Sequence, residues 1–132
     1  MIFDQKLEYH LLSGLLRKPE EYLNIQPFFS EQDIYAGDSL LRQSVFSLIK
    51  RAVESGESVD ATIIAQRLES LGITFDEEIS AGKFVESLAF RSVPEGSVYK
   101  TAIELKKLSE RRKTIEAMGR AVDKLKSLPR SA

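Results

Sequence analysis

The sequence predicts an all-α protein in which a compact head of about six short helices is followed by one long C-terminal helix. Apolar residues recur every three or four positions between turn residues, which is the period of a helix that buries one face. The stretch from Ser97 to Leu128 contains no Gly or Pro except Gly119, so nothing interrupts a long helix there. We therefore expect a single domain, with the helical head at 1–96 and the long basic helix at 97–132.

Composition places the chain among ordinary globular domains. Of its 132 residues, 42% are hydrophobic and 30% are charged, which is typical of one soluble domain with a modest core. There is no Cys, so disulfides and thiolate metal sites are excluded. The apolar runs fall far short of the ~20 residues that span a bilayer, and the N-terminus does not resemble a secretory signal. We expect the protein to work in the cytoplasm.

The first helix is predicted from Asp4 to Leu16. Its inward-facing residues are expected to be Leu7, Leu11, Leu12, Leu15 and Leu16. Gly14 within this helix costs about 1 kcal/mol relative to Ala, unless a neighbouring element packs closely on the backbone. The dipeptide Lys18-Pro19 ends the helix, and Pro19 can open a short second one.

Capping signals mark the next two helices of the head. Ser30 and Asp33 have the spacing of a capping box for a brief helix. Asp38 is predicted to cap a longer helix over 39–55, and Gly56 is well placed as the left-handed residue that ends it.

Two more helices complete the head. Asp60 is predicted to cap a helix over 61–71. The residues expected to face inward from it are Ile63, Ile64, Leu68 and Leu71. Segment 73–79 is acidic and is predicted to be a loop, because no second strand exists to pair with its Ile-Thr-Phe triplet. Ser80 begins the last helix of the head, over 81–90.

The apolar faces of these helices define an expected core. Its members are Leu11, Leu15, Phe46, Ile49, Ile64, Leu68, Phe84 and Leu88. If Leu68 is buried in this way, Leu68→Ala should cost ~2–5 kcal/mol of stability.

The long helix carries the strongest signal for association. Ser97 is expected to be its N-cap, and its apolar residues should form one continuous stripe. At about 1.5 Å per residue the helix would be roughly 45 Å long, longer than the head is wide. Part of the stripe should therefore lack an intramolecular partner and should pair with the same face of a second copy.

This predicted self-association surface consists of six residues. They are Arg111, Arg112, Ile115, Met118, Val122 and Leu125. The two arginines interrupt the stripe, so we expect them at the edge of the contact or reaching the acidic head of a neighbour.

Charge divides the chain at the same place as the predicted fold. From Lys100 onward there are ten Lys and Arg against four acids, a balance of +6. Because the whole chain carries −1, the part before Lys100 carries −7. An acidic head joined to a basic rod affects partners and association rates rather than the fold.

The sequence contains no recognisable catalytic motif. It has no Gly-rich phosphate-binding loop and no Ser in a nucleophile elbow. The single His10 is expected to pack or to face solvent rather than to bind a metal. Asp76, Glu77 and Glu78 lack the spacing of an EF-hand and should form a solvated loop. We predict no catalytic residue, no metal site and no bound cofactor in this chain, and instead a module that binds and assembles.

Four stretches carry a family resemblance. They are LEYHLLSGLLRKPE, FSEQDIY, VFSLIKRAVESGESVDATIIAQRLESLG and AGKFVESLAFRSVPEGSVYKTAIELKKLSERRKTIEAM. In this order and spacing they resemble the N-terminal domain of DnaB-type replicative DNA helicases, with Ser13-Gly14 standing where that family often has two glycines. The resemblance covers roughly Leu7 to Leu125. Segment 36–45 looks a few residues longer than the family turn, so its caps and side chains cannot be carried over.

The resemblance implies a function in assembly. In that family the head and a helical hairpin, of which the long helix is the first limb, pair with another subunit. Such pairs build a collar around the DNA channel and offer docking surfaces for primase and for helicase loaders. ATP, Mg and strand separation belong to an ATPase domain that follows in the family. The chain is therefore expected to be a domain of a longer helicase or a stand-alone relative.

Two other functions stay open at the level of sequence. The helicase-binding C-terminal domain of a bacterial primase has a similar helical architecture, although the segment from Ser92 to Arg112 fits the helicase better. A small helical nucleic-acid-binding protein could use the basic rod. That rod interleaves acids with its basic residues and offers only Tyr99 for stacking, so we expect DNA to bind weakly and less as salt rises.

Overall fold

The computed structural model describes residues 2–72, 80–94 and 96–129, and every regular element in these ranges is helical. The α-helices are α1 (Gln5–Arg17), α2 (Tyr22–Ile25), α3 (Leu41–Glu54), α4 (Ala61–Ser70), α5 (Ala81–Phe90) and α6 (Ser97–Ser127). Two short 3₁₀ turns are η1 (Pro19–Glu21) and η2 (Glu31–Asp33). The all-α prediction is confirmed. The predicted loop at 73–79, with Asp76, Glu77 and Glu78, lies outside the described residues.

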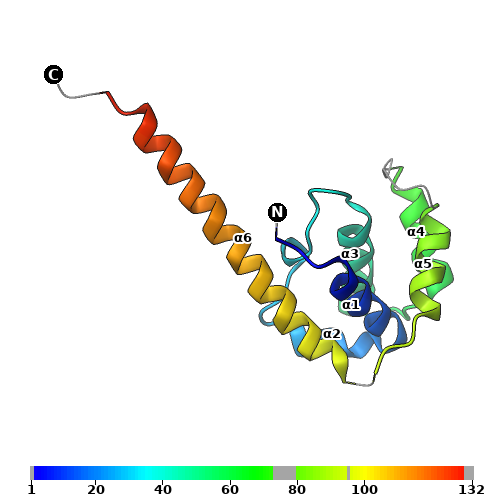
Figure 1. The fold of residues 1–132 in the computed structure, drawn as a ribbon. Coiled ribbons are helices and arrows are strands. Elements are labelled where there is room, and N and C mark those ends of the chain that lie inside the picture. Colours follow the sequence, from blue (N-terminus) through cyan, green and yellow to red (C-terminus); the bar gives the residue numbers. More distant parts are fainter. Residues whose placement is uncertain (1, 73–79, 95, 130–132) are drawn as a thin grey trace.

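The head is built around α1. This helix contacts α3, α5 and α6, while α4 packs chiefly on α5. Figure 1 shows α4 and α5 side by side on the flank of the head away from α6. In the same view α6 passes along the opposite flank and continues well beyond the head towards the C-terminus.

All eight predicted core residues are buried. Phe46 on α3 lies at the aromatic centre, with edge contacts to Phe29 at 5.4 Å and to Tyr22 at 6.0 Å between ring centroids. Tyr9 on α1 makes a similar edge contact with Phe84 on α5, at 5.6 Å. Offset and edge arrangements of this kind are favoured by the ring quadrupoles and add to the area that the rings bury.

Gly14 explains how α1 and α6 approach each other. A Cβ atom at this position would lie 2.6 Å from Cγ2 of Val98 on α6, closer than real Cβ contacts. The neighbouring element that the sequence required on this backbone is therefore α6. The close approach fixes the N-terminal end of the long helix against the C-terminal part of α1.

Most predicted caps are present. Asp60 accepts hydrogen bonds from backbone N–H groups of α4, and Ser30 with Asp33 forms the capping box on η2. Asp4 and Ser80, which the sequence placed at the starts of α1 and α5 without a capping role, accept bonds from their helices in the same way. Gly56 has a positive φ of 71°, and the bonds from Gly56 N to Val53 O and from Glu57 N to Ala52 O form the Schellman arrangement.

The predicted cap at Asp38 is wrong. Leu40 occupies the N-cap position of α3 without a side-chain bond, and Ser39 Oγ accepts from Leu41 N. The Asp38 carboxylate instead accepts from Arg42 Nη2 at 2.7 Å. Arg42 is fully buried, and a buried guanidinium requires anionic partners more than a helix end requires a cap.

The start of α6 also differs from the prediction by one residue. Gly96 holds the N-cap position with φ 78°, and Ser97 is the first helical residue rather than the cap. A residue in the left-handed region is best supplied by Gly, and this displaces the boundary from the Ser.

The buried face of helix α4 is narrower than the sequence predicted. Ile64 and Leu68 are buried, but Ile63 and Leu71 are 40% and 42% exposed, so their predicted inward positions are wrong. The small residues Ala61 and Ala65 of the same helix are partly buried and pack against the core instead.

Candidate self-association surface

Helix α6 has two halves with opposite surroundings. Val98, Ala102 and Leu105 are buried against the head, and Arg112 is the last buried residue of the helix. Every residue from 113 to 129 is exposed. We refer to 113–127 as the α6 overhang. The head thus covers only the first half of the helix, as its length predicted.

Four large apolar side chains lie along the overhang. They are Ile115, Met118, Val122 and Leu125, with exposed fractions between 48% and 68%. We call these four residues the apolar stripe. Their spacing of three and four residues places them on one helix face over about 15 Å. Soluble proteins seldom leave such a row in water unless a partner covers it.

The stripe does not continue the buried face of the first half. At about 100° per residue, its centre is rotated by roughly 130° about the helix axis from the mean direction of the buried residues. The prediction of one continuous stripe is therefore wrong, because several successive steps of three residues turn the apolar face steadily around the helix. The apolar stripe points away from the side on which the head lies. A partner must approach α6 from that other side.

The two arginines of the predicted self-association surface differ in their exposure and their partners. Arg111 is exposed, beside the first residues of the overhang. Arg112 is only 7% exposed and donates to Ile2 O at 2.8 Å and to Asp33 O at 3.2 Å. Its guanidinium carbon also lies 5.4 Å from the centre of the Tyr35 ring. Arg112 therefore reaches the head of its own chain, and the prediction that it lies at the edge of a contact is corrected.

Arg112 belongs to a polar cluster that the sequence did not reveal. Asp33 is fully buried, and its carboxylate accepts from Ser30 N at 2.9 Å, from Ser109 Oγ at 2.7 Å and from Lys106 Nζ at 3.2 Å. We call Asp33, Lys106, Ser109 and Arg112 the Asp33 cluster. A signal was present in the sequence, since Ser109 and Arg112 occupy the positions four and seven residues after the buried Leu105.

A second buried charge pair holds the head together. Arg42 on α3 donates through Nε to Glu8 on α1, and both side chains are inaccessible to solvent. Burial raises the pKa of Glu8, while the bonds from Tyr35 N and from Arg42 act against this rise. Arg42 Nη2 also reaches Tyr35 O at 3.3 Å. The pair links α1 to α3 and to the connection between η2 and α3.

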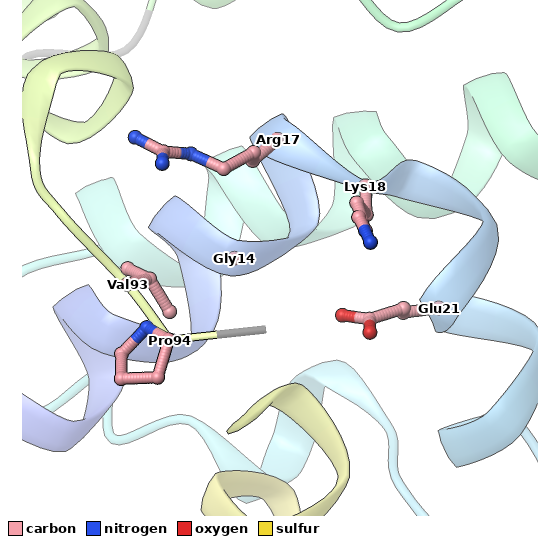
Figure 2. Close-up of a pocket in the computed structure, with 6 residues that line it drawn as sticks. All are labelled: Gly14, Arg17, Lys18, Glu21, Val93 and Pro94. Carbon is pink, nitrogen blue, oxygen red and sulfur yellow. The ribbon is translucent and has the colours of Figure 1, made fainter. Parts of the chain in front are cut away.

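Some hollows open on the surface of the head. Figure 2 shows one of about 220 Å³, where Val93 and Pro94 lie beside Gly14. Its other residues come from the end of α1 and from η1, and Arg17 among them donates to Arg91 O. A larger hollow, of about 610 Å³, runs between α4 and α5 beside the exposed ring of Phe90.

Neither of these hollows gathers groups that suggest chemistry. Within 2–72, 80–94 and 96–129, no three His, Cys, Asp or Glu side chains are grouped so that they could hold a metal ion. His10 on α1 is half-buried. The helices in the described part of the chain include none with the length and apolar character needed to cross a membrane.

Comparison with known proteins places this fold. The family model described as the DnaB-like helicase N terminal domain matches residues 2–89. The solved structure of the N-terminal domain of DnaB helicase from Mycobacterium tuberculosis superimposes with a TM-score of 0.83 at 20% sequence identity. That likeness covers 99% of this chain and 88% of the other, so it includes the long helix as well as the head. A search of curated protein sequences finds no significant match.

Proposed function

Because the chain belongs to the DnaB-like helicase N-terminal domain family, we propose that it is the assembly and protein-docking domain of a replicative DNA helicase. In this role it supports formation of a ring-shaped collar and receives a primase or a helicase loader in the cytoplasm. ATP and Mg act in the ATPase domain of such a helicase and not in this chain. The observation that carries the proposal is the exposed apolar stripe on α6.

The stripe favours a two-fold contact between two copies. In an antiparallel pair of overhangs centred near residue 120, Ile115 faces Leu125 of the second copy and Met118 faces Val122. The same surface is used on both sides, which is the commonest arrangement in homodimers. A parallel pair would set Arg111 beside its own counterpart, whereas the antiparallel pair moves the two Arg111 side chains to opposite ends.

The size of the stripe indicates a weak dimer. Full burial of a large apolar side chain is worth ~1.5–3 kcal/mol, and each stripe residue is already about half buried, so about 1 kcal/mol remains for each. Eight such side chains in the pair provide about 8 kcal/mol, against an association cost of about 4–15 kcal/mol. The surplus is at most about 4 kcal/mol, so the overhangs alone should form a weak dimer with a dissociation constant of about 1 mM or higher. A second helix folded back on α6, as the family has, would add to the contact.

Sedimentation equilibrium tests this interface. The double variant Met118→Glu with Val122→Glu should be monomeric at concentrations where the wild-type chain dimerises. The matched control is Arg120→Gln with Lys124→Gln, which changes the net charge by the same amount on the other face of the overhang and should still dimerise. A dimer that persists in the stripe variant, or a wild-type chain that is monomeric throughout, refutes the proposed contact.

Nucleic acid is a weaker candidate partner for this chain. The overhang carries Lys113, Arg120, Lys124 and Lys126, but Glu116 and Asp123 lie among them. Any affinity for a single-stranded oligonucleotide should rest on counterion release and fall steeply with salt. Fluorescence anisotropy near physiological salt should show no submicromolar binding, and tight binding there would favour the nucleic-acid function over assembly.

A further inference from the structure

The structure holds α6 against the head in two zones of different character. The first zone is apolar and comprises Val98, Ala102 and Leu105 near the start of the helix, where Gly14 allows close approach. The second zone is the Asp33 cluster, in which hydrogen bonds join Asp33 of the head to the last buried turn of α6. Beyond this cluster every residue of the overhang is exposed.

We propose that the Asp33 cluster is a positioning device that sets the direction of the α6 overhang and so controls whether the apolar stripe can pair. This inference rests on the proposed self-association. It assigns a role in assembly to Asp33, Ser109 and Arg112, none of which belongs to the stripe.

The length of the helix makes the second zone decisive. From Ala102 to Leu125 the helix extends about 35 Å, so a tilt of about 10° around the apolar zone moves Leu125 by about 6 Å. Packed helices lie only about 8–10 Å apart between their axes. A tilt of this size separates the side chains of an antiparallel pair at one end. The first zone alone is too near the pivot to prevent it.

The cluster has the features of a directional lock. The Asp33 carboxylate is held by the η2 backbone through Ser30 N and also accepts from Ser109 Oγ, so it joins the head to one turn of α6. Arg112 adds two bonds to backbone carbonyls of different segments, at Ile2 and at Asp33. Hydrogen bonds to charged groups are short and orientation-dependent, unlike apolar contacts, which permit sliding.

The surrounding charges support the same arrangement. Lys106 binds the Asp33 carboxylate and also lies 3.4 Å from Glu110, and Lys113 at the start of the overhang is 3.9 Å from Asp33. The buried carboxylate at this contact thus attracts lysines that lie seven residues apart on the helix. None of the residues of the Asp33 cluster belongs to the apolar core of the head.

Distance measurement by pulsed electron paramagnetic resonance tests the inference. The chain lacks Cys, so spin labels can be attached at Gln66→Cys on α4 and Lys124→Cys on the overhang, both exposed. The Met118→Glu and Val122→Glu background keeps the chain monomeric. Arg112→Met should shift or broaden the distance distribution by about 6 Å for a tilt of about 10°. Lys107→Met removes one charge from α6 outside the cluster and should leave the distribution unchanged.

Sedimentation without the stripe substitutions provides the second readout. Arg112→Met should weaken dimerisation by at least about tenfold, an expected loss of about 1.4 kcal/mol, while Lys107→Met should not. If the wild-type chain is monomeric, the proposed self-association fails, but the spin-label distances still decide whether the cluster directs the overhang. If Arg112→Met unfolds the head, Ser109→Ala takes its place. An unchanged distance distribution in the variant that stays folded overturns the inference.

Discussion

Replacement of Gly14 by Ala tests the close approach of α1 and α6 by a single methyl group. Gly14 lies inside α1 with ordinary helical backbone, so Ala should stabilise the helix itself by about 1 kcal/mol. The added Cβ, however, would stand 2.6 Å from Val98 Cγ2. Val is stiff in a helix because one χ1 rotamer dominates, so this methyl group cannot turn away easily.

The cost of the clash between the added methyl group and Val98 should exceed the gain in helix propensity from Gly to Ala. Overpacking of a core typically costs about 1–3 kcal/mol, and subtraction of the helix-propensity gain leaves a net destabilisation of about 0–2 kcal/mol. The matched control is Gly82→Ala on α5, whose Cβ would meet Glu69 Oε1, the movable end of a long side chain, at 2.8 Å. This control should be neutral or stabilised by up to about 1 kcal/mol.

Urea denaturation followed by far-ultraviolet circular dichroism measures both free energies of unfolding. In a Val98→Ala background the methyl group that causes the clash is gone, so Gly14→Ala should become favourable, with a coupling of about 1 kcal/mol or more. A Gly14→Ala variant as stable as Gly82→Ala would show that Val98 and the added methyl group do not clash. The same would follow if the Val98→Ala background left the effect of Gly14→Ala unchanged.

Two further predictions concern the head. Leu68→Ala should cost ~2–5 kcal/mol of unfolding free energy because Leu68 is fully buried. Leu71 is 42% exposed just past the end of the same helix, so Leu71→Ala should change the free energy of unfolding by no more than about 0.5 kcal/mol. Equal losses of stability in thermal or urea unfolding would contradict the burial of Leu68 on α4. Burial, with the Glu54 carboxylate nearby, raises the pKa of Tyr22 from 10.0 to about 12. The stabilising contribution of neutral Tyr22 is thus fully present below pH 10 and is lost as pH rises through about 12, because the unfolded chain releases the proton first. The difference in unfolding free energy between wild type and Tyr22→Phe should therefore shrink by about 2–3 kcal/mol as pH rises from about 10 to about 12. A difference that stays constant would contradict the raised pKa of Tyr22.

The core and most caps could be predicted because their causes are local. Leu11 and Leu15, four residues apart, are both buried in the helix that their spacing defines. Asp60 caps α4 because the N–H groups that it satisfies lie two and three residues further on. Such short-range partners can be read from the sequence without knowledge of the fold.

The errors arise where a distant partner competes with a local one. Asp38 turns from the start of α3 to Arg42, which is buried because it pairs with Glu8 on another helix. The sequence suggests that Arg112 lies at the edge of a contact between copies, but its acceptors at Ile2 and Asp33 are far away along the chain. The direction of the apolar stripe was missed for a different reason. Each spacing of three or four residues between apolar side chains fits a single helix face, but successive spacings of three add up to a rotation of that face around α6.

The rotation of the stripe relative to the buried face makes the chain sensitive to helix phase. Insertion of one residue between Arg112 and Ile115 would turn the stripe by about 100° without changing a single side chain in it. Insertion of seven would restore the direction to within about 20° and move the stripe about 10 Å further from the head. The number of residues in this short interval therefore sets both the angle between two paired heads and their separation. Natural variation in length should occur here in steps that nearly complete whole turns, such as about seven, eleven or eighteen residues.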